Sequence, residues 1–291
     1  MPPRTNLSQI AIPQDFKTFP RSGGQRLPWE GFFYNIILAL KDLALGDYNT
    51  IMPYQRFTSE RFPEPVIQFY GNGAGLARRY LVWGFLMSIW NIVFTSDFRT
   101  LLVTLYYRSA EVGGILFGPQ DSGTGSLRLP ATEENTTVTP PSDPLNGTTN
   151  DYPSHPANNL PSNNPLPSNR VTTHISPFGA AMPARTVYMA LISALSEAAV
   201  HGATDRIDET FTSHFDSFAC VLVTRPVMPP RRDPPIYQWG HLIVALPQVM
   251  EEFVGRAEFR ESSLSIKVDG VTVGLARFEV VERGEEGVRE G

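Results

Sequence analysis

Cysteine is almost absent from this chain of 291 residues, in which only Cys220 carries a thiol. A single cysteine cannot form an intrachain disulfide or supply a metal site built from several thiolates. Because Cys220 lies in an apolar run, the sequence favours a small buried hydrophobe over a reactive thiol. No group of histidines and carboxylates has the spacing of metal ligands, so we predict no metal and no other cofactor.

Long hydrophobic runs are also missing. The most apolar stretch, residues 80–94, is shorter than the roughly 20 residues of a membrane-spanning helix, so we expect a buried helix and no membrane span. The N-terminus shows no apolar segment typical of a secretory leader, which favours a cytoplasmic location. The Asn-X-Thr triplets at Asn135 and Asn146 are acceptor sequences for N-glycosylation and leave secretion open.

Charge is sparse as well. Charged residues make up 18% of the chain, and the net charge is −5. Phosphate contacts favour a basic surface, so this balance argues against a general nucleic-acid binder and leaves room for a local basic patch. Hydrophobic residues make up 42%, which suffices for packed cores and excludes a fully disordered chain.

What the chain does contain is an internal repeat, the strongest indicator of its fold. Short anchors recur in the same order, and the distance between copies drifts only from 154 to 161 positions, as insertions in loops would produce. The paired anchors are Tyr34 and Tyr188, Phe57-Thr58-Ser59 and Phe211-Thr212-Ser213, Trp83-Gly84 and Trp239-Gly240, and Val112-Gly113 and Val273-Gly274.

The apolar pattern of each copy predicts the element order α-β-α-β-β. In the second copy Asp269-Gly270 predicts a type I′ turn, and a slip of the apolar phase after Gly274 predicts a β-bulge, which we expect at Gly113 too. The fold class is therefore α+β, a tandem duplication of a two-layer unit with a small, three-stranded antiparallel sheet. So small a sheet has a modest core, and we expect the two units to dock as an intrachain pseudo-twofold dimer.

Composition sets the domain boundaries. The segment between the copies holds 11 prolines and 8 asparagines, too polar to offset the entropy of ordering it, so we predict a disordered linker. The predicted parts are an extended or disordered arm over 1–26, the first repeat over 27–118, the linker over 119–182, the second repeat over 183–282 and a charged tail over 283–291.

The duplicated residues are structural in character and include no repeated acid, base or nucleophile. This favours a non-catalytic binding or structural protein, in which the paired repeats present a groove or an edge strand to a protein partner. The Phe-Thr-Ser motif is interpreted as local turn structure, and the two Trp-Gly pairs as core packing.

One alternative is an enzyme, a hydrolase with its site at the interface of the repeats. Its candidate catalytic residues are His214, His241 and Asp208, with Asp205 and Glu252 as further carboxylates. General acid–base chemistry requires at least two of these groups within hydrogen-bond reach in one pocket.

A second alternative is a nucleotide or anion binder. The glycine-rich loop from Gly71 to Gly75 follows a predicted strand and precedes a predicted helix, although its spacing departs from the dinucleotide-binding pattern. One arginine pair precedes the second helix in each copy, where positive charge opposes the helix dipole. They are expected to bind carboxylates across the repeat interface or an anion, and they are Arg78, Arg79, Arg231 and Arg232.

Overall fold

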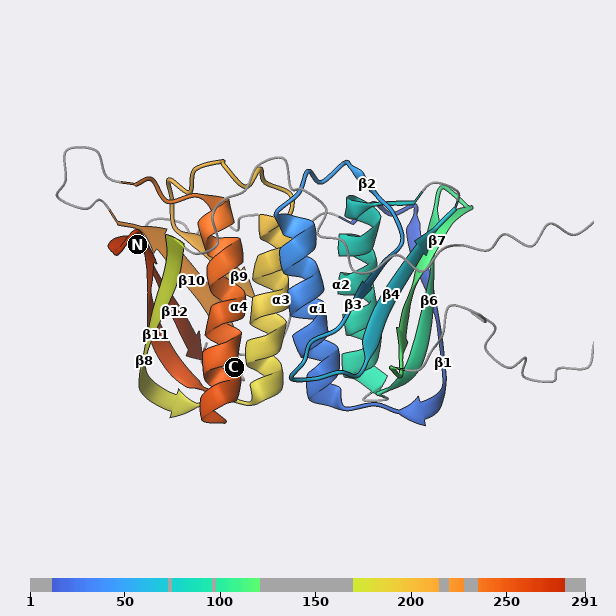
Figure 1. Cartoon of the computed structure of the whole chain (residues 1–291), viewed down its shortest axis with the longest axis horizontal. Helices are drawn as coiled ribbons and strands as arrows, with labels where there is room; N and C mark the ends of the chain where they lie inside the picture. The colour runs from blue at the N-terminus through green and yellow to red at the C-terminus, as the bar shows by residue number, and fades with distance from the viewer. Residues whose placement is uncertain are drawn as a thin grey trace, which may run out of the picture.

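The computed structural model describes residues 12–72, 75–95, 98–120, 170–214, 220–227 and 235–280 of the chain. Within them lie four helices and three antiparallel sheets, so the mixed α+β class is confirmed. The helices stand between two five-stranded sheets, one at each end of the molecule (Figure 1). No helix of the described part is long and apolar enough to cross a membrane.

The N-terminal half contains one five-stranded sheet, two helices and a small two-stranded sheet. Its large sheet has the order β1-β6-β7-β4-β3, and β2 pairs with β5. The elements are β1 (Phe16–Arg26), α1 (Trp29–Ala44), β2 (Ile51–Met52), β3 (Gln55–Phe57), β4 (Val66–Gly71), β5 (Leu76–Ala77), α2 (Arg78–Thr95), β6 (Arg99–Tyr107) and β7 (Ala110–Gly118).

The C-terminal half has the same order of elements without the small sheet. Its sheet runs β8-β11-β12-β10-β9, which matches the order of the first sheet strand for strand. The elements are β8 (Val171–Ala181), α3 (Ala184–Ala198), β9 (Phe211–His214), β10 (Cys220–Pro226), α4 (Trp239–Arg256), β11 (Arg260–Val268) and β12 (Val271–Val280).

The prediction of three-stranded sheets is wrong, because each sheet gains a strand at both edges. Strand β1 lies in the predicted arm over 1–26, and β8 lies in the predicted linker over 119–182. Both are edge strands with few buried side chains, only Phe16 in β1 and Val171 and Ile175 in β8. Such strands show little apolar alternation, and their glycines and prolines read as loop.

The inner hairpins follow their predicted turn chemistry. Asp269 and Gly270 have φ values of 50° and 76°, and a type I′ turn needs positive φ at both positions. The pairing register shifts at Leu105/Tyr106 and at Ile266/Lys267, so the predicted bulges are confirmed in both halves. Gly113 has a φ of 153°, and a Cβ there would lie 2.2 Å from the Tyr70 carbonyl oxygen.

The two halves meet through their first helices. Helices α1 and α3 lie side by side at the centre of the molecule (Figure 1). Phe33 stacks on Tyr188 with ring centroids 5.5 Å apart, and Trp29 meets the same ring edge-on. Arg61 donates to the Val254 carbonyl of α4 at 3.0 Å. Aromatic stacking of this kind adds to the hydrophobic gain of a buried contact.

Candidate functional site: the groove between β8 and α4

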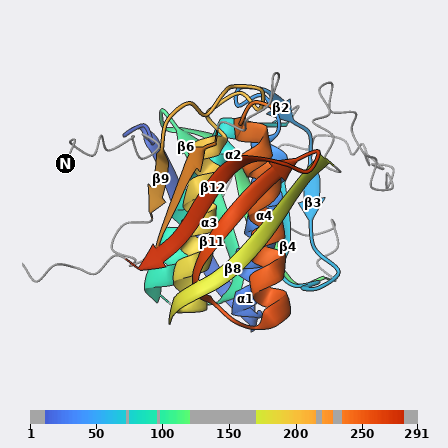
Figure 2. The same cartoon turned by 90° about the vertical axis from the view of Figure 1, so that its left-hand side faces the viewer.

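Strand β8 has one open edge in the described structure, because its only sheet partner there is β11 (Figure 2). The Arg170 carbonyl accepts from Asp269 at the turn between β11 and β12, whereas the Val171 carbonyl accepts from Gln248 of α4. Backbone groups alternate in direction along an antiparallel strand. Those of Thr173 and Ile175 therefore point away from β11, to the open side.

One stripe of helix α4 runs beside this open edge. Gln248, Glu252 and Arg256 follow each other at intervals of four residues, which places them on one helix face. Gln248 Nε2 donates to the Val171 carbonyl at 3.0 Å, and its oxygen accepts from the Thr173 hydroxyl at 3.3 Å. Glu252 and Arg256 form an exposed ion pair. The stripe and the edge together form what we call the edge groove.

A shallow hollow of about 10 Å³, with room for roughly one water molecule, lies at one end of the edge groove and is open to solvent. Apolar and charged residues line it together. The lining residues are Ile175, Pro177, Glu252, Phe253, Arg256, Glu258 and Ser262.

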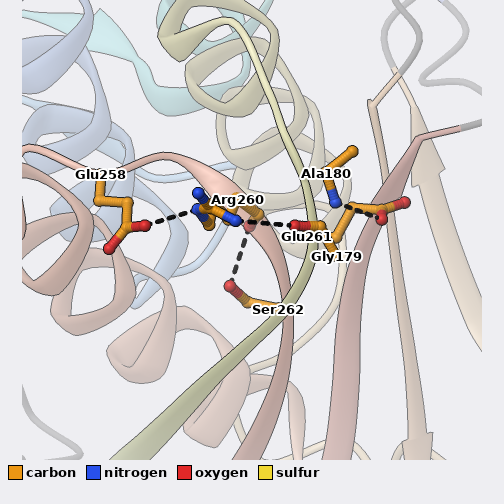
Figure 3. Close-up of polar contacts among 6 residues, drawn as sticks. All are labelled: Gly179, Ala180, Glu258, Arg260, Glu261 and Ser262. Carbon is orange, nitrogen blue, oxygen red and sulfur yellow. Dashed lines mark hydrogen bonds and ion pairs between the residues drawn. The ribbon is translucent and has the colours of Figure 1, made fainter.

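The end of β8 beyond this hollow is held in place by Glu261 (Figure 3). The Glu261 carboxylate accepts from the Ala180 N–H of β8 at 2.9 Å and from the Val280 N–H of β12 at 3.0 Å. These two bonds hold the pKa of Glu261 below its usual value, and the bond from Val280 has the larger effect. A Cβ at Gly179 would overlap this carboxylate, so the glycine leaves room for it.

The corresponding edge of the N-terminal sheet is built differently. Strand β1 carries Lys17, Arg21 and Arg26, whereas β8 has no charged side chain. Pro20 pairs with Val103 as Ile175 pairs with Leu264, so β1 lacks an N–H where β8 offers one. Charges and proline on an edge hinder pairing with another strand. The edge of β1 is therefore blocked at Pro20 and flanked by charges, whereas the edge of β8 is open at Thr173 and Ile175 and its open stretch ends at Pro177.

The predicted catalytic residues of the described part each have other contacts. His241 Nδ1 accepts the Gln238 N–H at 3.2 Å and caps the start of α4, and burial lowers the pKa of His241. Asp208 forms an exposed ion pair with Arg206, and Asp205 accepts the Gly202 N–H. These contacts join no predicted histidine–carboxylate pair in the described part of the chain. His214 ends β9, and its side chain lies outside that part.

The arginines predicted to bind an anion have other contacts. Arg78 donates to the carbonyls of Asp42 and Leu43 at 3.0 and 2.9 Å, and so caps the C-terminal end of α1. Burial lowers the pKa of Arg78. Arg79 donates to the Asn49 side chain and lies over the Tyr80 ring. Arg231, Arg232 and the middle of the Gly71–Gly75 loop lie outside the described residues.

Replacing Arg78 by alanine is expected to lower the free energy of unfolding by about 2 kcal/mol, since two charge-assisted bonds to a helix end are lost. A Cβ at Gly46 would overlap the Arg78 guanidinium, so Gly46→Ala should cost a similar amount. Arg79→Ala, with its exposed partner Asn49, is the control and should cost less than about 1 kcal/mol. Urea unfolding measures all three. Stabilisation of the wild type by phosphate, lost in Arg78→Ala, would instead support the anion site.

Sequence reasoning overlooked Glu197, an ionisable group in the core of the C-terminal half. Its side chain in α3 is 7% exposed. Burial raises the pKa of Glu197 to about 8, although the hydroxyls of Ser193 and Ser213 oppose the shift. The offset between Tyr34 and Tyr188 aligns it with Leu43 of the first copy. A glutamate where the other copy has a leucine was the signal that could have revealed it.

Comparisons with known proteins do not assign the chain to a family. No family model matches it, and no curated protein matches it. Among solved structures, the tandem DUF26 ectodomain from the Arabidopsis thaliana cysteine-rich receptor-like protein PDLP8 is similar over 90% of this chain and 96% of that chain. The identity is 6% and the TM-score 0.25. A likeness this weak carries no argument about fold or function.

Proposed function

We propose that the chain is a non-catalytic binding protein whose edge groove takes an extended polypeptide segment as an added strand beside β8. The observation that carries this proposal is the open, uncharged edge of β8 next to a helix stripe. Strand addition uses main-chain hydrogen bonds for affinity and flanking pockets for specificity. Here Thr173 and Ile175 supply the main-chain groups, and the shallow hollow beside Ile175 and Phe253 has room for a group about the size of a methyl.

We also propose that the groove is supported by two copies of one duplicated unit that dock on each other. The two large sheets share one strand order, and both carry a bulge at the matching glycine. Stacking of Phe33 on Tyr188 and the bond from Arg61 to α4 support a docked pair. Docking fixes α4, and α4 in turn fixes one wall of the groove.

Replacing Thr173 by proline is expected to weaken the binding of extended peptides at least about tenfold, because a hydrogen bond is lost and the ring obstructs the edge. The Thr173 N–H points away from β11, and proline is tolerated in that position of an edge strand. Thr173→Val is the matched control, since it keeps the N–H and loses only the hydroxyl contact with Gln248.

The measurement uses an array of random ten-residue peptides, followed by titration of the best binders. Hydrogen exchange should then show slower exchange at the amides of Thr173 and Ile175 when a peptide is bound. Equal binding by Thr173→Pro and Thr173→Val would overturn the proposal. Sedimentation velocity tests an alternative occupant. If the wild type forms a dimer and Thr173→Pro abolishes it, a second copy of the chain pairs with the β8 edge instead of a peptide.

A further inference from the structure

A row of aromatic side chains crosses the outer face of the N-terminal sheet, the face turned away from the helices. The pairing register places Tyr70, Gly114, Thr104 and Phe19 side by side on β4, β7, β6 and β1. A Cβ at Gly114 would lie 2.6 Å from the Tyr70 ring. The ring therefore lies flat over that glycine, and its hydroxyl reaches the Thr104 side chain.

Phe19 stands at the other end of this row and is 54% exposed. Tyr106 of the neighbouring row meets it edge-on, with ring centroids 5.2 Å apart. We call Tyr70, Phe19 and Tyr106 the aromatic row. Phe19 is the exposed ring and contacts Tyr106, while both tyrosines are half-buried. Apolar rings gathered on one sheet face mark an interaction site more often than a single exposed ring does.

Positive charge flanks the aromatic row. Lys17 and Arg21 are exposed two residues before and after Phe19, and so lie on the same face of β1. Glu111 is the carboxylate near the row, 3.5 Å from the Tyr106 hydroxyl. At physiological ionic strength charges are screened beyond about 8 Å. The local excess of positive charge therefore acts on a ligand here, rather than the chain's net charge of −5.

The fold itself does not require these rings. In the second sheet the matching row consists of Arg225, Leu275, Ser265 and His174, which the same register aligns across β10, β12, β11 and β8. The position of Tyr70 is thus an arginine there, and the position of Phe19 is a histidine. The two sheets share one topology, and the second has no ring at the positions that match Tyr70 and Phe19, so the fold does not require rings at these two positions.

We infer that the aromatic row binds single-stranded nucleic acid, with bases on the rings and phosphates at Lys17 and Arg21. Aromatic faces on a sheet stack bases of any sequence, and a flanking line of cations follows the backbone. Lys17, Phe19 and Arg21 repeat at about 6.8 Å along β1. A cation, a ring and a cation at this spacing suit alternating phosphates and bases.

The test is fluorescence anisotropy with a labelled twelve-nucleotide oligo-dT and oligo-rU, at 50 and 200 mM salt. Phe19→Ala and Tyr106→Ala should each weaken binding at least about fivefold, the loss expected when one stacked base is removed. Phe178→Ala is the matched control, because Phe178 is an exposed ring of the other sheet, 55% exposed under Arg277. It should leave the affinity unchanged.

Charge removal gives an independent readout. The double variant Lys17→Gln, Arg21→Gln should reduce the slope of log affinity against log salt by about 1.4 for a single strand. Three results would overturn the inference: no binding of either oligonucleotide at 50 mM salt, equal losses in Phe19→Ala and Phe178→Ala, or binding of a neutral polysaccharide such as soluble starch in place of the oligonucleotides. The residues of the aromatic row, Lys17 and Arg21 lie in the N-terminal sheet, away from the edge groove, so binding there and binding at β8 are tested by different variants.

Discussion

Glutamine in place of Glu197 is expected to stabilise the protein at pH 7 by roughly 3 kcal/mol. The pKa of Glu197 rises from its ordinary 4.5 to about 8 in the folded chain. Between these values the folded state holds one more proton than the unfolded state, so the stability of the wild type falls as pH rises. Each pH unit in that window costs about 1.4 kcal/mol, and the loss is complete above pH 8. Glutamine cannot ionise and keeps a polar group beside Ser193 and Ser213.

Urea unfolding of both proteins at pH 4.5, 7 and 8.5 checks this. The two should have nearly equal stability at pH 4.5, and the difference should grow with pH until about pH 8. Glu258→Gln serves as the control, because Glu258 is an exposed residue paired with Arg260 and should show no such growth. A difference between the wild type and Glu197→Gln that is constant from pH 4.5 to 8.5 would contradict the prediction.

The two halves differ at one matching core position, which is Glu197 in α3 and Leu43 in α1. Leu43 at the aligned position of α1 is 1% exposed, so both sites lie in the core. The leucine needs no partner, whereas a carboxyl group in the core needs hydroxyls beside it. Ser193 in α3 supplies one of them, and its aligned residue Ala39 does not. The second half thus contains a polar cluster of Glu197, Ser193 and Ser213.

The inner part of the fold could be predicted because its residues obey strong periodic patterns. The stripes of α1 and α3, and the alternation of Leu264 and Ile266 in β11, follow from burying one face of each element. Trp83 and Trp239 are each 7% exposed, in agreement with core packing. The Phe-Thr-Ser motif forms the predicted turn structure in the first half, where Thr58 and Ser59 bond the backbone of Pro63 and Phe62 after Phe57 ends β3. In the second half the whole motif lies in the edge strand β9.

The candidate site could not be predicted in the same way. Its main-chain groups belong to β8, whose polar and proline-containing sequence continues the composition of the preceding segment. Its side chains belong to α4, about 70 residues further on, where Gln248 is an ordinary helix residue until tertiary packing sets it against Val171. Only the fold joins the two. The spacing of Gln248, Glu252 and Arg256 was visible in the sequence, but nothing there indicated what that face would meet.

Cutting the chain between Gln120 and Arg170, at an inserted protease site, is expected to leave the two halves associated on native size-exclusion chromatography. Tyr188→Ala should make them elute separately at micromolar concentration. Removing a buried aromatic ring costs about 3–5 kcal/mol, and much of this loss falls on the interface, because Phe33 and Trp29 of the other half both contact Tyr188. We expect the dissociation constant of the cut halves to rise at least about a hundredfold.

The control for this experiment is Phe278→Ala. Phe278 is fully buried and packs on Phe253 within its own half, so its loss should lower the stability of that half by a similar amount while the cut halves still co-elute. Separate elution of the cut wild type would contradict docking and leave two independent modules on one chain. Co-elution of the Tyr188→Ala halves would place the main contact elsewhere, and Arg61, which donates to the Val254 carbonyl of α4, would be the next residue to replace.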